Sequence, residues 1–128
     1  MTVVLDSYGL TTLAAKRAHL EELRRRGEWP AIVPCVVLAE ALTGDHRRDY
    51  HENRLLRACD VRPVDELLAR AAAALRSQLS ARRPPSAVDA IVVAMADDAG
   101  GATILSSDPG ELRVLARHAV HEVTISPV

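Results

Sequence analysis

Aromatic residues are scarce in this chain of 128 residues, which has no phenylalanine, one tryptophan and two tyrosines. Stacking of bases on aromatic rings therefore cannot dominate any binding of RNA. The two cysteines, Cys35 and Cys59, suit a reducing cytosol better than a disulfide framework. No apolar run approaches the roughly 20 residues of a membrane span, and the first residues lack the pattern of a signal peptide. We therefore expect a cytoplasmic protein that does not enter a membrane.

An excess of charge of either sign is also missing, since 16 Lys and Arg face 17 Asp and Glu and the net charge is −1. This balance provides no global attraction to nucleic acid or to a membrane, so any such binding requires local patches. Lys16 is the only lysine, and it falls in the first predicted helix. This position argues against a phosphoacceptor domain of the response-regulator kind, which also gathers acids at strand ends but needs a lysine on a late strand.

The length and the apolar content predict a single domain, residues 1–128, with a core that needs no disulfide or structural metal. We find no internal repeat, linker or low-complexity tract. Short β-branched runs alternate with helical patterns, which predicts an α/β protein whose mostly parallel sheet carries helices on both faces. The predicted strands are residues 2–5, 31–33, 61–64, 102–105 and 120–125, and the predicted helices are residues 7–26, 35–42, 65–79, 86–99 and 108–118. Pro63 confines the third strand to an edge.

The stretch from Ser86 to Glu111 is the most informative part of the sequence. Apolar residues at helical spacing predict a helix that ends at Gly100-Gly101, where glycine reaches the left-handed backbone region without steric cost. The run from Ala102 to Leu105 then has the pattern of a buried strand. Between Pro84 and Leu112 there are five carboxylates and no lysine, arginine or histidine. This uncompensated negative charge beside buried apolar segments indicates a bound cation.

Three of the candidate acids have an alternative explanation as helix caps. Asp6 can be the N-cap of the first helix, Asp89 can complete a capping box with Ser86, and Asp108 can be an N-cap followed by proline. Glu40 has no such explanation. It stands in a helix that is otherwise apolar all round, which predicts burial, and a buried carboxylate is unfavourable without a partner.

A cluster of carboxylates that binds a divalent cation explains the four acids together. Asp6 and Asp108 directly follow predicted strands, at the edge where parallel sheets bind their ligands. Mg²⁺ and Mn²⁺ take oxygen ligands, and such an ion would offset the repulsion that raises the pKa of crowded acids. Two such ions about 4 Å apart can orient a water and stabilise the leaving oxygen when a phosphodiester is cut.

The order of these motifs resembles that of the PIN-domain ribonucleases. After the strand before Asp6 come Val-Pro-Cys-Val-Val-Leu-Ala-Glu-Ala-Leu around Glu40, Ser-Ala-Val-Asp-Ala-Ile-Val-Val-Ala-Met-Ala around Asp89, and Thr-Ile-Leu-Ser-Ser-Asp ending at Asp108. The resemblance covers nearly the whole chain. Within that family the sequence is most similar to the VapC toxins of bacterial toxin–antitoxin pairs.

The resemblance implies a PIN-like α/β/α sandwich with a central sheet of four to five strands. It also implies a Mg²⁺- or Mn²⁺-dependent endoribonuclease that cleaves RNA and forms homodimers. A cognate antitoxin would inactivate the enzyme by inserting a segment near the acids. The resemblance assigns the catalytic and metal-binding roles to Asp6, Glu40, Asp89 and Asp108.

Two positions near these acids deserve comparison with the family pattern. Ser107 stands where the family usually has Ser or Thr before the last aspartate, and it would hold a ligand or a water. Tyr8 replaces the family's small polar residue two positions after the first aspartate. That departure motivates a second interpretation, in which the chain is a catalytically weak or inactive PIN-like module that binds RNA or a protein without cutting.

Other charged residues support weaker hypotheses. For RNA binding, the best-placed basic residues are Arg82 and Arg83, followed by Arg47 and Arg48. The triplet Arg24-Arg25-Arg26 is better explained as a complement to the helix dipole. Glu111 is a candidate fifth acid, although its place at a helix N-terminus favours capping. His118 and His121 have metal-like spacing but no evident carboxylate companion, and the sequence offers no account of Asp97-Asp98 at a helix C-terminus.

Overall fold

The computed structural model describes residues 1–79 and 83–128, and within these residues it has five parallel strands and seven helices. The strands lie in the order β3-β2-β1-β4-β5. Their bounds are β1 Val3–Leu5, β2 Ile32–Pro34, β3 Asp60–Arg62, β4 Ala102–Leu105 and β5 Val123–Ser126. The helices are α1 Ser7–Ala14, α2 Arg17–Arg25, α3 Val37–Ala41, α4 Tyr50–Leu56, α5 Glu66–Ser77, α6 Ala87–Asp98 and α7 Gly110–Ala116.

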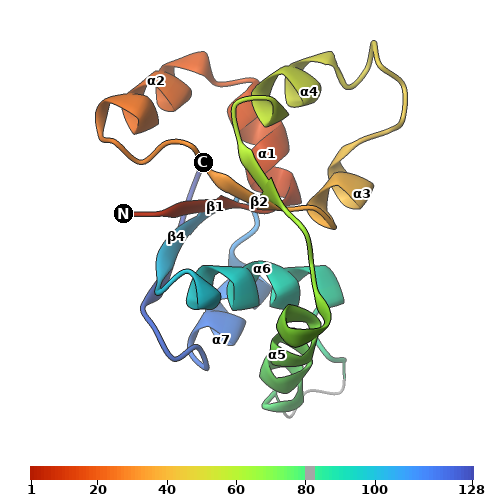
Figure 1. The fold of residues 1–128 in the computed structure, drawn as a ribbon, viewed down its shortest axis with the longest axis vertical. Coiled ribbons are helices and arrows are strands. Elements are labelled where there is room, and N and C mark those ends of the chain that lie inside the picture. Colours follow the sequence, from red (N-terminus) through yellow and green to blue (C-terminus); the bar gives the residue numbers. More distant parts are fainter. Residues whose placement is uncertain (80–82) are drawn as a thin grey trace.

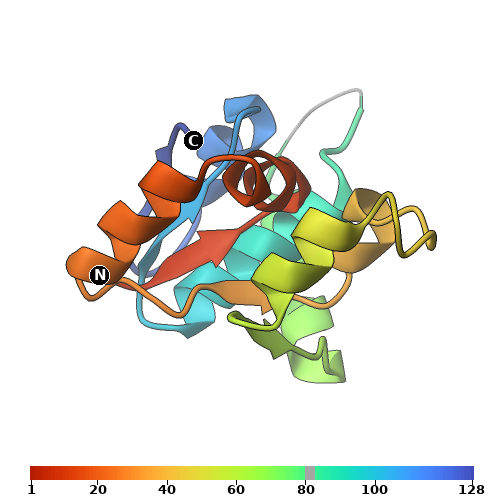
Figure 2. The same ribbon diagram turned by 90° about the horizontal axis from the view of Figure 1, so that it is seen from above.

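Helices cover both faces of this sheet, as the alternating pattern predicted. Helices α1, α2 and α4 lie on one side, and α5, α6 and α7 lie on the other (Figure 1). The view from above shows α1, α2 and α4 spread over the strands (Figure 2). The prediction of a largely parallel α/β sandwich is confirmed, and the third strand is at an edge as Pro63 indicated.

The core is centred on β1, the middle strand of the sheet. Val3, Val4 and Leu5 are buried because they have a strand on each side and helices on both faces. In the register, Val4 pairs with Ile32 of β2 and with Ile104 of β4. A continuous β-branched run suits a strand that is covered on both faces. Since all strands run the same way, their carboxyl ends meet at one edge, where Asp6 and Ser106 follow β1 and β4.

The sequence predicted one continuous helix over residues 7–26, and this prediction is wrong. The chain forms α1 and α2 with a break at Lys16, whose φ and ψ are −118° and 76°. Leu13 and Leu23 are both buried. Leu13 enters the core from α1 and Leu23 from α2. The break occurs without glycine or proline, and no local signal marks it.

The prediction that Glu40 lies in a buried helix is also wrong. Pro34 is the last residue of β2 rather than the start of a helix, and α3 has only five residues. Of these, only Val37 is buried, and Glu40 is exposed. A helix this short at the end of the sheet packs with one side only, against α1 and β2. Its apolar sequence therefore does not imply burial all round.

Side-chain and backbone geometry mark the helix ends, and the predicted stop at Gly100-Gly101 is confirmed. The Asp65 side chain caps α5 by accepting a hydrogen bond of 2.8 Å from the backbone N–H of Leu68. Gly100 and Gly101 end α6 with φ of 85° and 104°. Cys35 and Cys59 are both free thiols. Across the described ranges, every helix is too short or too polar to cross a bilayer.

Candidate active site

Asp6 is a buried carboxylate at the carboxyl end of the central strand. Its side chain has 2% of its surface exposed. One oxygen, Oδ1, accepts a 2.6 Å hydrogen bond from the backbone N–H of Gly9, so the prediction that Asp6 caps the first helix is confirmed. The other, Oδ2, accepts a 2.6 Å hydrogen bond from the Ser106 hydroxyl. Both carboxylate oxygens are thus held in place at the junction between β1 and α1.

Burial raises the pKa of Asp6 above its ordinary value, since removal from water disfavours the charged form. The hydrogen bonds from Ser106 and Gly9 act in the opposite direction. The negative charges of Asp108 and Glu40 raise this pKa further. The pKa of Asp6 therefore depends on two acids that lie far from it in the sequence.

Gly9 is a site residue that the sequence reasoning missed. A Cβ at this position would stand 2.0 Å from the carbonyl oxygen of Leu105 and 3.1 Å from Asp6 Oδ1. The first turn of α1 therefore packs directly against the end of β4, and only glycine leaves enough space. This close approach brings Asp6 within reach of the residues that follow β4.

Ser106 is the second residue that sequence reasoning missed. Its hydroxyl is fully buried, donates to Asp6 and accepts a 3.0 Å hydrogen bond from the backbone N–H of Asp108. It therefore joins the loop after β1 to the loop after β4. Ser107, the position that the family pattern indicated, is exposed. The paired serines gave a signal, but only the alternation of side chains at the end of β4 decides which hydroxyl points inward.

Asp108 is not the helix cap that its sequence context suggested. Helix α7 begins at Gly110, its N-cap position is Pro109, and no side chain caps it. Asp108 is exposed at the carboxyl edge of the sheet. The capping interpretation of this aspartate is therefore wrong, and its carboxylate is available for another purpose.

Asp89 lies in the first turn of α6, but its carboxylate does not form the capping-box hydrogen bond that was predicted. The Ser86 hydroxyl accepts from the backbone N–H of Asp89 at 3.4 Å, as expected. In a capping box the Asp89 carboxylate would accept the second hydrogen bond, from the backbone N–H of Ser86. Here Glu111 Oε2 accepts that hydrogen bond instead, at 3.2 Å. Glu111 thus completes the cap from the next helix and leaves Asp89 facing the other acids.

The pKa of Asp89 is raised to about 7, and burial is the largest cause. The other causes of this raised pKa are a side-chain hydrogen bond with Glu111, the charge of Glu111, and the charges of Asp6 and Glu40. One proton shared between Asp89 and Glu111 relieves the repulsion between neighbouring carboxylates. The arrangement is that of a cluster which lacks a positive partner.

Five acids from separate parts of the chain thus influence one another at one edge of the sheet: Asp6, Glu40, Asp89, Asp108 and Glu111. In residues 1–79 and 83–128, none of them forms an ion pair with Lys, Arg or His. Oxygen donors with this excess of negative charge fit a hard divalent cation. However, no three acidic, histidine or cysteine side chains of the described residues are already close enough to hold a metal. Asp6 is fixed, and the exposed side chains of Glu40 and Asp108 would have to turn toward it.

The remaining candidates lie elsewhere. Asp97 accepts hydrogen bonds from the backbone N–H groups of Val120 and His121, at 3.0 and 2.8 Å, and lies 2.9 Å from His121 Nδ1. This aspartate therefore holds the turn before β5, and His121 does have the carboxylate companion that the sequence failed to indicate. The contacts give both residues a structural role.

The arginines divide into paired and unpaired groups. In the triplet, Arg24 pairs with Glu21, and Arg25 and Arg26 both pair with Glu22, which supports a structural role. The predicted RNA-binding residues Arg47, Arg48 and Arg83 are exposed. Arg82 lies outside the described residues.

A carboxylate cluster at the carboxyl edge of an all-parallel five-stranded sheet defines an α/β protein with an acidic candidate active site. Residues 4–117 match the PIN domain family, and the chain belongs to that family. A search of curated proteins finds no significant match.

Solved structures share this fold at low sequence identity. A chain of the DNA-bound VapBC from Salmonella typhimurium superposes with a TM-score of 0.74 and 13% identity, covering 99% of this chain and 98% of that chain. VapBC2 from Rickettsia felis, bound to a DNA fragment from its promoter, gives 0.73 and 12%, with 100% and 99% covered. A toxin–antitoxin complex from Klebsiella pneumoniae gives 0.61 and 18%, with 84% and 87% covered. The likeness to these structures shows the fold.

Proposed function

We propose that this protein is a metal-dependent endoribonuclease of the VapC kind, the toxin of a toxin–antitoxin pair. The observation that carries the proposal is the convergence of the five acids without a cationic partner among the described residues. Structural ion pairs do not account for the cluster, and neither do helix caps, because Asp108 and the Asp89 carboxylate cap nothing. Membership of the PIN domain family supports the same conclusion.

In this proposal the metal ligands come from Asp6, Glu40, Asp89 and Asp108. A bound Mg²⁺ or Mn²⁺ would supply an activated water and stabilise charge on the phosphodiester oxygens. Ser106 and Gly9 fix the Asp6 carboxylate, which reduces the conformational entropy lost on binding. Because Asp89 has a pKa of about 7, protons compete with the cation below that pH, and metal affinity rises as the pH increases through it.

Cleavage of purified cellular RNA in the presence of Mg²⁺ or Mn²⁺ tests the proposal. Asp89→Asn and Asp108→Ala are expected to abolish cleavage and to remove saturable metal binding in calorimetry. Asp98→Asn is the matched control, since Asp98 is an exposed acid at the far end of the same helix as Asp89. Full cleavage by Asp89→Asn or Asp108→Ala under saturating metal would refute the proposed site.

A PIN-like module that binds without cutting is the second candidate. It is favoured by the absence of a preassembled metal ligand set in the described residues and by Tyr8 at a position where the family has a small polar residue. Against it, Tyr8 is 54% exposed and Asp6 is held by Gly9 and Ser106 instead. RNA binding by a folded protein that neither binds a divalent cation nor cuts RNA would favour this candidate.

We propose further that a cognate antitoxin binds this chain and that the active form is a homodimer. The toxin–antitoxin and VapBC assemblies with the same fold support the first part. A groove of about 520 Å³ between α1, α2 and α4 has both leucines (Leu13, Leu20 and Leu55) and arginines in its wall, and it suits an amphipathic segment. Growth arrest on expression of this chain, relieved by a small protein encoded beside it that co-purifies, is the expected result. Growth arrest that this protein does not relieve would contradict the pairing.

A further inference from the structure

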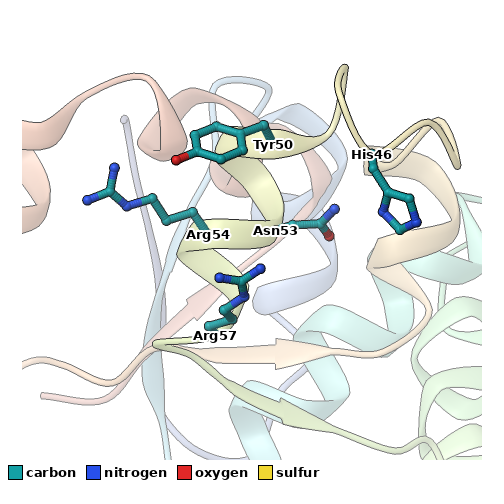
Figure 3. A pocket seen from close by; sticks show the side chains of 5 residues that line it. All are labelled: His46, Tyr50, Asn53, Arg54 and Arg57. Atoms are coloured by element: carbon teal, nitrogen blue, oxygen red, sulfur yellow. The ribbon is translucent and has the colours of Figure 1, made fainter.

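A cavity of about 360 Å³ on the outer side of α4 is lined by polar and basic side chains, and one of them, Arg54, also borders the groove between α1, α2 and α4. We call it the α4 surface, and its residues are His46, Tyr50, Asn53, Arg54 and Arg57. Figure 3 shows Tyr50, Arg54 and Arg57 projecting from the helix, with Asn53 pointing toward His46 on the preceding segment. No acidic side chain lines this cavity.

The arginines around this surface are free of ion pairs within the part of the chain that the structure describes. Arg54 and Arg57 have no carboxylate partner, and neither do Arg47 and Arg48 in the segment before the helix. On α2 and α5, by contrast, Arg25 and Arg70 pair with glutamates of their own helices. Two unpaired arginines, Arg54 and Arg57, that line one cavity in a chain with net charge −1 indicate an anionic partner.

Tyr50 gives the α4 surface a second kind of contact. Its ring is 55% exposed, and His51 meets it edge-on at 5.2 Å between centroids. An exposed aromatic face beside guanidinium groups suits one stacked base next to phosphates. An acidic peptide would use the arginines but would gain nothing specific from the ring.

The segment that carries the α4 surface is fixed to the segment that carries Glu40. Asp49 is a buried carboxylate that accepts hydrogen bonds from Thr43 and Gly44, at 2.8 to 3.0 Å, and so holds the turn between α3 and α4. Helices α3 and α4 both pack against α1, which Asp6 caps. The α4 surface is therefore held rigidly relative to the acidic cluster.

We infer that the α4 surface binds single-stranded RNA, with Arg54 and Arg57 on phosphates and one base stacked on Tyr50. The inference deepens the proposed function and rests on it, because the bound strand is the substrate of the acidic site. The RNA backbone is repelled by the five acids in the absence of metal, and this surface supplies the attraction that the net charge of the chain lacks.

Binding of a fluorescently labelled single-stranded RNA of mixed sequence, measured by anisotropy in a chelator so that nothing is cut, tests the inference. Arg54→Gln/Arg57→Gln is expected to weaken binding about tenfold and to lower the slope of log K against log salt by about 1.4. Tyr50→Ala is expected to weaken binding about tenfold, while Tyr50→Phe, which keeps the ring, binds like the wild type. All three side chains are exposed.

The matched control is Arg25→Gln/Arg70→Gln, which removes the same charge from arginines that pair with glutamates. Equal losses in this control and in the α4 double variant would overturn the inference. Unchanged RNA binding in the α4 variants would also overturn the inference. If these variants bind RNA normally but lose binding to polyglutamate, the partner of the surface is an acidic protein.

The failure of the inference is distinguishable from failure of the proposed function. If the α4 variants bind RNA normally while Asp89→Asn abolishes metal-dependent cleavage, the proposed nuclease function is supported and the proposed RNA-binding role of the α4 surface is refuted. If the α4 variants lose binding but the wild type never cuts RNA with any metal, the surface stands and the proposed nuclease does not. A wild type that binds no RNA in the chelator refutes the inference, while the proposed nuclease is then decided by the metal-dependent cleavage assay alone.

Discussion

Replacing Asp89 with asparagine is expected to stabilise the metal-free protein at high pH. In the folded state the Asp89 carboxyl has its pKa raised from 3.8 to about 7. The folded chain therefore holds the proton more tightly than the unfolded chain. The stability that comes from the protonated form is complete below about pH 4 and is lost as the pH rises through about 7. Asparagine stays neutral throughout and can still donate a hydrogen bond to Glu111.

The magnitude follows from the two pKa values. A change from 3.8 to about 7 would correspond to roughly 4 kcal/mol of folding free energy for a fully buried group, and solvent screening of the half-buried Asp89 lowers this figure. Because Asp89 and Glu111 share the proton, part of this energy belongs to the pair, and we expect Asp89→Asn to be about 2 to 4 kcal/mol more stable than wild type near pH 8. Near pH 4 the two proteins are expected to be nearly equal.

Urea unfolding of both proteins in a chelator, at several pH values from about 4 to about 8, measures this difference. The control is Asp98→Asn, which is expected to leave the free energy of unfolding within about 0.5 kcal/mol at every pH. Added Mn²⁺ is expected to stabilise wild type but not Asp89→Asn. The difference in their free energies of unfolding should therefore shrink or change sign. The reasoning is refuted if Asp89→Asn is no more stable than wild type near pH 8, or if the difference is the same at all pH values.

Two further substitutions test the contacts that hold Asp6. Gly9→Ala places a Cβ 2.0 Å from the Leu105 carbonyl oxygen, and the resulting overpacking is expected to lower the free energy of unfolding in urea by about 2 to 4 kcal/mol. Gly110→Ala, which meets nothing within 4 Å, is expected to be neutral or slightly stabilising, and equal effects of the two would contradict the close approach. Ser106→Ala removes the hydroxyl that donates to Asp6 and is expected to cost about 1 to 3 kcal/mol and to weaken metal binding in calorimetry. Ser107→Ala is the control, and a larger effect of this exposed position would show that the wrong serine has been assigned.

The periodicity of the sequence predicted most of the fold because the central strands are short runs rich in β-branched residues and several stops are residues with special backbone chemistry. Gly100-Gly101 and Pro63 are such residues. The break at Lys16 could not be predicted, because no glycine or proline marks it. Glu40 was misplaced for a related reason: the exposure of a five-residue helix depends on what it packs against, and its own sequence does not contain that information.

For the candidate site, the sequence indicated the acids but not what holds them. The uneven distribution of charge between Pro84 and Leu112 is visible in the sequence alone. The roles of Gly9 and Ser106 appear only in three dimensions, because they depend on how closely α1 approaches the end of β4. The exchange of capping partners, in which Glu111 replaces Asp89 at Ser86, likewise depends on the packing of α6 against α7.

The pairing of the central strand has a consequence for the order in which the protein assembles. Val3 lies beside Thr103, and the Ser106 hydroxyl reaches Asp6 across 100 residues of sequence. Contacts this distant form late, since a long loop must close before they stabilise anything. A chain still emerging from the ribosome without β4 lacks both Ser106 and Asp108, so it has no acidic site. If the proposed nuclease function holds, its activity is coupled to completed synthesis, and the proposed antitoxin would meet no incomplete but active chain.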